Sequence, residues 1–164
     1  MHKKLGYFLT ILICTLIVVG VIFTFYTLST KGDLEKEIVI NSDGKAHDVL
    51  EVNSMKLFPS EKKLYDVGLT SKLEGTFHVR LDFNEIEDGG MKEFVDVIIK
   101  VGEEEIFEGK LSYLLGDYVV EFDSLIKKKS LTIIEIEYSM SEEVGNEAKN
   151  TFSSFNIDLT IERK

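Results

Sequence analysis

Several features are scarce or missing in this sequence, and each one excludes a class of protein. The only cysteine is Cys14, which lies inside an apolar run, so the residues after that run can form no disulfide. The only proline is Pro59, so there is no LPxTG-type sorting signal. The His-Glu-x-x-His and Gly-x-Ser-x-Gly motifs of zinc peptidases and serine hydrolases are absent too. The sequence therefore lacks the common signatures of a disulfide-stapled domain and of a hydrolase.

Positive charge is also in short supply. The chain has 19 Lys and Arg against 29 Asp and Glu, which gives a net charge of −10. The first thirty residues contain Lys3 and Lys4 and no acid, so the remaining residues carry about −12. A surface of this sign repels phosphates, which excludes nucleic acid as a partner and disfavours a position flat on anionic lipid. The charge is typical of a soluble, exported domain.

One long apolar segment stands at the start of the chain. Residues 5–28 contain no charged side chain, and residues 1–4 before them include both lysines. A helix of this length, at about 1.5 Å per residue, is about 36 Å long and covers a hydrocarbon core of about 30 Å. Basic residues stay on the cytoplasmic side of such a helix. We expect a cytoplasmic segment at 1–4, a transmembrane or signal-anchor helix at 5–28, and an extracellular C-terminal domain.

This apolar segment is longer than the apolar region of a cleaved signal peptide, which has about 7–15 residues. We therefore prefer a retained anchor, which makes the chain a single-pass protein of the cell membrane. The alternative is cleavage near Ser29 and Thr30, which would release the domain.

Beyond the apolar segment, apolar and polar side chains alternate at period two, the pattern of strands that bury one face. The expected inward rows are Phe77, Val79, Leu81 and Phe83; Val95, Val97, Ile99 and Val101; and Phe155, Ile157, Leu159 and Ile161. Shorter strands are predicted at 49–52, 64–69, 105–107 and 118–122, with glycine-containing turns between them.

Residues 131–140 are strand-like but change parity once. Leu131 and Ile133 share one face, whereas the apolar residues from Ile134 onward share the other. A β-bulge near 133–134 would place them all on one side. Only 141–149 suggests a helical turn. Many short strands and almost no helix predict an all-β fold, a jelly-roll or Ig-like antiparallel β-sandwich over 49–164.

The segment between the anchor and the sandwich, residues 29–48, is polar and mixed, and we interpret it as a stalk. It contains a short β-branched stretch, Ile38, Val39 and Ile40. Two roles remain open for this stretch. It is either the first strand of its own domain or a donor strand that completes the sheet of a neighbouring copy.

Four segments of the second half of the chain resemble a known family. Residues 106–114 resemble a Y-x-G-x-L-x-x-L segment, residues 140–147 a P-x-x-A-G-N-E signature, and residues 150–160 a final S-x-x-F-D-L-T-F strand. Residues 125–133 correspond to a further segment but lack its Pro-Gly turn. These are segments of camelysin/TasA-type proteins, which are bacterial surface and biofilm-matrix proteins, and the resemblance covers about 56–164.

The resemblance implies a jelly-roll-like β-sandwich and a structural role at the cell surface, as a matrix or fibre component or as its membrane-anchored accessory. We expect self-association, or association with related matrix subunits, because the sheet edges of a sandwich offer unpaired backbone groups for strand addition. The signature residues Gly145, Asn146 and Glu147 are interpreted as a turn, since Gly and Asn tolerate positive φ. A ligand role for Asn146 or Glu147 is the alternative.

Some relatives in the family have been called metallopeptidases, so the alternative function is a membrane-tethered metallo-endopeptidase of the camelysin type. No catalytic residue is assigned, no cofactor is expected, and a non-enzymatic function is preferred. His47 and His78 are the candidates for zinc ligation with a carboxylate, and two exposed histidines are the simpler interpretation. The acidic loops at 85–90 and 102–105 do not match the oxygen spacing of an EF-hand.

Overall fold

The computed structural model describes residues 34–164. The cytoplasmic segment at 1–4, the transmembrane helix at 5–28 and the cleavage site near Ser29 and Thr30 were predicted for residues outside this range. Within the described part of the chain, no helix is long and apolar enough to cross a bilayer. Leu34–Lys164 forms one compact unit, so the sandwich begins inside the segment that we interpreted as a stalk.

The described residues form nine strands, one short α-helix and one 3₁₀ turn. In chain order they are β1 (Leu34–Ile40), β2 (Lys45–Met55), β3 (Lys62–Ser71), β4 (Gly75–Gly89), β5 (Val95–Val101), β6 (Glu104–Lys110), α2 (Leu111–Leu114), β7 (Val119–Ile126), β8 (Leu131–Met140), η1 (Asn146–Ala148) and β9 (Phe152–Arg163). The all-β class predicted from the alternating pattern is confirmed.

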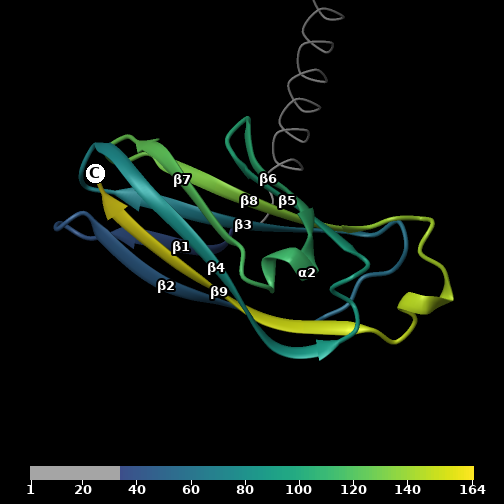
Figure 1. The fold of residues 1–164 in the computed structure, drawn as a ribbon. Helices are drawn as coiled ribbons and strands as arrows, with labels where there is room; N and C mark the ends of the chain where they lie inside the picture. The colour runs from purple at the N-terminus through teal and green to yellow at the C-terminus, as the bar shows by residue number, and fades with distance from the viewer. Residues whose placement is uncertain (1–33) are drawn as a thin grey trace, which may run out of the picture. The chain divides into compact units, whose positions relative to one another are not determined.

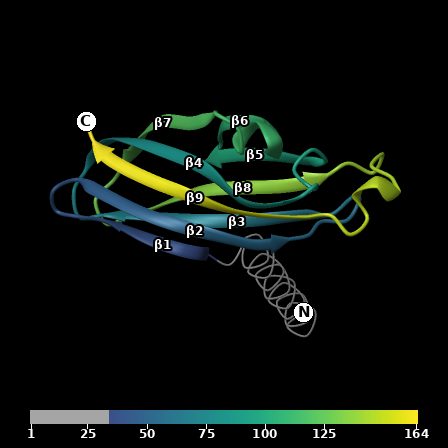
Figure 2. The same cartoon turned by 60° about the horizontal axis from the view of Figure 1, so that its bottom comes forward.

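The strands form two sheets that pack face to face (Figure 1, Figure 2). One sheet has five strands in the order β1-β3-β8-β5-β6, and the other has four in the order β2-β9-β4-β7. Every strand pair is antiparallel except β1 with β3, which run parallel. Because β1 and β2 are consecutive but lie in different sheets, the turn at 41–44 carries the chain from one sheet to the other.

The core lies between the sheets and is built from the inward rows that the alternation predicted. Side chains of all three rows are buried, and Val101 at the end of its row is half-buried. Removing an apolar side chain of this size from water contributes about 1.5–3 kcal/mol. The outward partners in the same strands are polar except for Ile98, so the alternation specifies the register of each strand.

The predicted bulge in β8 is wrong. The pairing of β8 with β3 continues through Ile133 and Ile134 without a shift, and its pairing with β5 is regular as far as Ile134. Leu131 is 43% exposed and stays on the outer face, where its Cδ1 lies 2.8 Å from the position that a Cβ on Gly68 would take. Leu34 covers the same glycine. The missing side chain of Gly68 thus provides the space in which two outer leucines pack, and no change of register is needed.

Gly89, at the end of β4, provides a test of how tightly the sheet is packed. A Cβ on Gly89 would lie 2.5 Å from the carbonyl oxygen of Phe152, whereas a Cβ on Gly145 would meet nothing within 4 Å. We expect Gly89→Ala to lower the free energy of unfolding by about 1–3 kcal/mol, because backbone of β9 has to move. Gly145→Ala, the matched control, should change it by less than about 0.5 kcal/mol. Urea unfolding of both variants measures the difference, and equal stabilities would contradict the packing described here.

Candidate functional site

The predicted donor segment is strand β1. It forms the outer edge of the five-stranded sheet, with Ile38 opposite Leu69 and Ile40 opposite Ser71 of β3. Ile38 and Ile40 are buried in the core, whereas Val39 is 55% exposed. In this structure the segment therefore serves as the first strand of its own domain. Its inward residues occupy the core beside an edge strand, which is where a strand donated by a neighbouring copy would place its side chains.

A charged pair connects β1 to the opposite sheet. Lys36 has the inward parity of Ile38 and Ile40, and its Nζ donates to Asp48 Oδ1 of β2 at 2.6 Å and to the carbonyl of Val49 at 3.0 Å. The hydrogen bond from Lys36 is the main cause that lowers the pKa of Asp48, and a bond from the Val49 amide adds to it. We call Lys36 and Asp48 the clamp, because they join the edge strands of the two sheets.

A slot opens beside the clamp, between β1 and β2. It has a volume of about 300 Å³. Glu35, Lys36 and Glu51 contribute charged groups to its lining, and Tyr65 and Ile136 are among its apolar walls. Tyr65 packs edge-on against the buried ring of Tyr138, with 5.4 Å between the ring centroids. Burial raises the pKa of Tyr65, and the nearby Glu35 raises it further. The side of the sandwich next to β1 therefore has a slot with apolar walls, and the lysine of the clamp is one of its charged lining residues.

Asp66 of β3 is another feature at the start of β1. It is opposite Leu34 in register and only 6% exposed, and its Oδ1 has no hydrogen-bond partner among residues 34–164. Burial raises the pKa of this carboxyl. A raised pKa means that the folded state binds the proton more tightly than the unfolded chain, so ionised Asp66 costs stability at neutral pH. The pairing of β1 with β3 thus begins beside an unfavourable group.

The two candidate zinc ligands are not brought together. His47 lies on β2 and pairs with Thr160 of β9, whereas His78 lies on β4 and pairs with Glu162 of β9. Strand β9 separates them. His78 Nδ1 lies 3.0 Å from Asp123 Oδ1, in a network of exposed charges on the outer face of the four-stranded sheet. No group of three or more His, Cys, Asp or Glu in residues 34–164 is arranged to hold a metal ion.

The signature residues lie in the long connection between β8 and β9. Asn146 and Glu147 begin the η1 turn, and Gly145 before it has a φ of −81°. The expected use of positive φ at this signature is therefore wrong, and the left-handed residue of the connection is Asn150, with a φ of 64°. Gly145 and Asn146 instead border a surface hollow of about 440 Å³. Next to them, Phe58 is 71% exposed.

The clamp was missed in the sequence, although a signal for it exists. Lys36 shares the parity of Ile38 and Ile40, and Asp48 shares the parity of Ala46 and Leu50. One charge of each sign on two inward rows indicates a pair that meets at the rim of a core. What the sequence does not contain is the adjacency of β1 and β2 across the sandwich.

The comparisons with known proteins give no assignment: neither the scan of protein families nor the search of curated proteins finds a match to this chain.

The clamp should make the stability of the domain depend on pH. Because Asp48 has a lowered pKa in the folded state, its stabilising effect is complete above the ordinary aspartate pKa of about 4 and is lost as the pH falls through the lowered value. We expect Asp48→Asn to cost up to about 1 kcal/mol of unfolding free energy at pH 7, since the pair is partly exposed. Amide hydrogen exchange of β1 should become faster.

The difference between wild type and Asp48→Asn should shrink as the pH falls below the ordinary aspartate pKa, because Asp48 then becomes protonated. Glu162→Gln is the matched control, because it removes the well-exposed Lys45–Glu162 pair on the outer face of the four-stranded sheet. That variant should leave the exchange of β1 unchanged. Equal exchange rates in wild type and Asp48→Asn would show that the clamp does not hold β1.

Proposed function

We propose that the chain is a cell-surface structural protein of the camelysin/TasA type, a matrix or fibre component or its membrane-anchored accessory. In this proposal residues 5–28 hold it in the cell membrane as a single-pass protein, and the acidic sandwich lies outside. The observation that carries the proposal is β1, a terminal edge strand that puts only two side chains deep into the core. Strands of this kind are the ones that sandwich proteins exchange between copies.

The strand order supports the jelly-roll form of the sandwich. Without β1, the sheets read β2-β9-β4-β7 and β3-β8-β5-β6, which is an eight-stranded arrangement of two interleaved sheets. This is the form that the resemblance over 56–164 implies. Strand β1 is then an addition to the edge of the second sheet, and its pairing with β3 is the one parallel strand pair within residues 34–164.

Exchange of β1 would preserve almost every contact that β1 makes. A copy of β1 from a neighbour would present the same isoleucines to the core and the same backbone groups to β3. The hydrogen bond from Thr70 Oγ1 to Glu37 Oε1 would also form again. The free energies of the closed and exchanged states therefore differ mainly by the strain of the turn at 41–44 and by the entropy of association. Confinement to a membrane surface reduces the second cost by raising the local concentration.

Self-association is directly measurable. Residues 30–164 contain both sheets and the whole described core, so this fragment is suitable for light scattering over a concentration series. We expect the mean mass to rise with concentration above that of a single chain. A single-chain mass at every concentration would contradict the proposed function.

A second prediction tests whether β1 can be supplied by another molecule. A chain of residues 41–164 lacks β1, and a synthetic peptide of residues 34–40 should bind it, because β3 then offers an unpaired edge. We expect the peptide to restore folding or to raise the unfolding midpoint by a few degrees, about 4–8 °C per kcal/mol gained. The control peptide carries Ile38→Asp and Ile40→Asp and should have no effect. A response to both peptides, or to neither, would exclude specific strand donation.

A further inference from the structure

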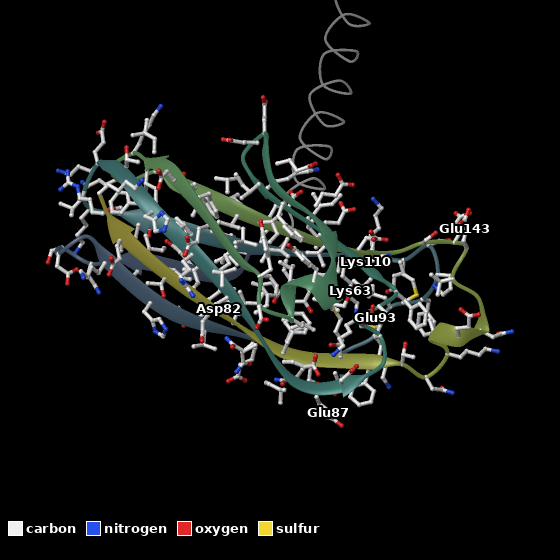
Figure 3. The ribbon with its side chains drawn as sticks, in the orientation of Figure 1. Lys63, Asp82, Glu87, Glu93, Lys110 and Glu143 are labelled. Atoms are coloured by element: carbon white, nitrogen blue, oxygen red, sulfur yellow. The ribbon has the colours of Figure 1, made fainter. Side chains whose placement is uncertain are left out.

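The two ends of the sandwich carry opposite charge. We define the basic end as residues 41–45, 72–74, 127–130 and 162–164, which lie where β1, β3, β7 and β9 end. Its side chains include seven cations and three acids. We define the acidic end as residues 56–61, 85–94 and 141–151, with eight acids and three cations. Figure 3 shows Glu87, Glu93 and Glu143 of the acidic end on the side away from the C-terminus.

The basic end has a core of four lysines that make no ion pair with any described residue. They are Lys72, Lys127, Lys128 and Lys129, and all four are exposed. The amide of Lys129 donates to the carbonyl of Ser71 at 2.8 Å, which joins the two loops. Leu125, two residues before Lys127, is 63% exposed. The end thus presents positive charge beside a large apolar side chain.

The acidic end contains the hollow described above. Its apolar lining comes from Leu57, Phe58, Pro59, Val144 and Ala148. Glu142 and Lys149 contribute its two charged groups, and Glu143 and Glu147 lie in the same connection of the chain.

The hollow is built on backbone hydrogen bonds. The Ser60 amide donates to the carbonyl of Met140 at 2.9 Å, and the Met140 amide donates to the carbonyl of Glu61. These bonds fix the connection at 56–61 against the start of the connection at 141–151. Glu142, Glu143 and Glu147 are exposed and have no ion-pair partner among the described residues.

We propose that the hollow at the acidic end receives the basic loop at 127–130 of a second copy of this chain, so that copies associate head to tail. The occupant follows from charge complementarity: three unpaired glutamates at one end face the unpaired lysines of the other. Leu125 and Phe58 supply exposed apolar surface on the two sides. The proposal deepens the proposed function, on which it rests, by giving self-association a direction.

Head-to-tail contact leaves binding patches free for further copies. The two patches are different and lie at opposite ends of one molecule, so each copy that docks leaves one free patch of each kind. A heterologous interface of this type extends into an open chain unless the rotation between successive copies closes it into a ring. Complementary charge sets the register and orientation and speeds the encounter, and it is weakened by salt. The rest of the surface carries more acidic than basic residues, so repulsion opposes other arrangements of two copies.

The test uses the full chain in detergent micelles, with two different affinity tags on two preparations. One tag is captured, and the co-captured fraction of the other preparation is measured at low salt. The basic-loop variant carries Lys127→Glu, Lys128→Glu and Lys129→Glu, and the hollow variant carries Glu142→Lys, Glu143→Lys and Glu147→Lys. Each variant paired with itself should fall to about a tenth of the wild-type fraction or less. The two variants mixed together should return to at least about half of it, because the charges are complementary again.

The matched control carries Glu103→Lys, Glu104→Lys and Glu105→Lys at the β5–β6 hairpin, which is the same change of charge in another place. It should associate as wild type does. Glutamine variants of the same loop and of the same hollow are measured in parallel. Each should lose association with itself and regain it on mixing, because the unchanged lysines of one variant meet the unchanged glutamates of the other. Because glutamine removes a charge without adding the opposite one, these variants still test the contact if a charge-reversed chain unfolds.

The outcomes separate this proposal from the proposed function. Wild-type copies that fail to capture each other at any concentration overturn the proposed function itself. Wild-type capture that persists in both charge-reversed variants overturns only the head-to-tail contact. Loss in both variants without recovery on mixing also overturns it, because general repulsion then accounts for the loss.

Discussion

Burial of alternate side chains between two sheets is the constraint on which everything else in this domain depends. Most strands have one mainly apolar row and one mainly polar row, and the sandwich hides the apolar rows between its sheets. Phe77, Leu81 and Leu159 are fully buried, although their sequence neighbours are half-buried or exposed. With no disulfide in the described residues, this burial and the ladders of backbone hydrogen bonds hold the fold. The outer surface is therefore free to carry charge without cost to the core.

The same constraint leaves a weak point at β1. An edge strand has one neighbour instead of two, and β1 meets that neighbour over a parallel pairing that begins beside the buried carboxyl of Asp66. The ion pair between Lys36 of β1 and Asp48 of β2 offsets part of this cost by holding β1 to the opposite sheet. A strand that is held by two isoleucines and a partly exposed ion pair is easier to release than any central strand, because local opening follows local burial. The proposed exchange between copies uses this difference in stability within one fold.

The loops add a second level of organisation that the core does not require. The connections at one end of the sandwich are rich in lysine, and those at the other end are rich in glutamate and surround an apolar hollow. A sandwich of this kind would fold equally well with the charges scattered, since exposed charges contribute little to stability. Their separation matters for association, where orientation is set by long-range charge and completed by apolar contact. Strand exchange and end-to-end docking use different parts of the domain, the edge strand β1 and the end loops.

The class of fold follows from the order of the residues alone, because a period of two is a local property that needs no knowledge of neighbouring strands. The inward rows at 77–83, 95–101 and 155–161 follow directly from it. The same local pattern wrongly predicted a bulge after Leu131, because this side chain packs over Gly68, which belongs to a strand that is distant in sequence. It also failed at Gly145, whose φ is set by the course of the connection at 141–151 and not by the freedom of glycine. Only the tertiary structure decided that β1 pairs with β3, that Lys36 meets Asp48, and that lysines and glutamates gather at opposite ends. These facts depend on which strands become neighbours, and adjacency arises from the packing of the whole core.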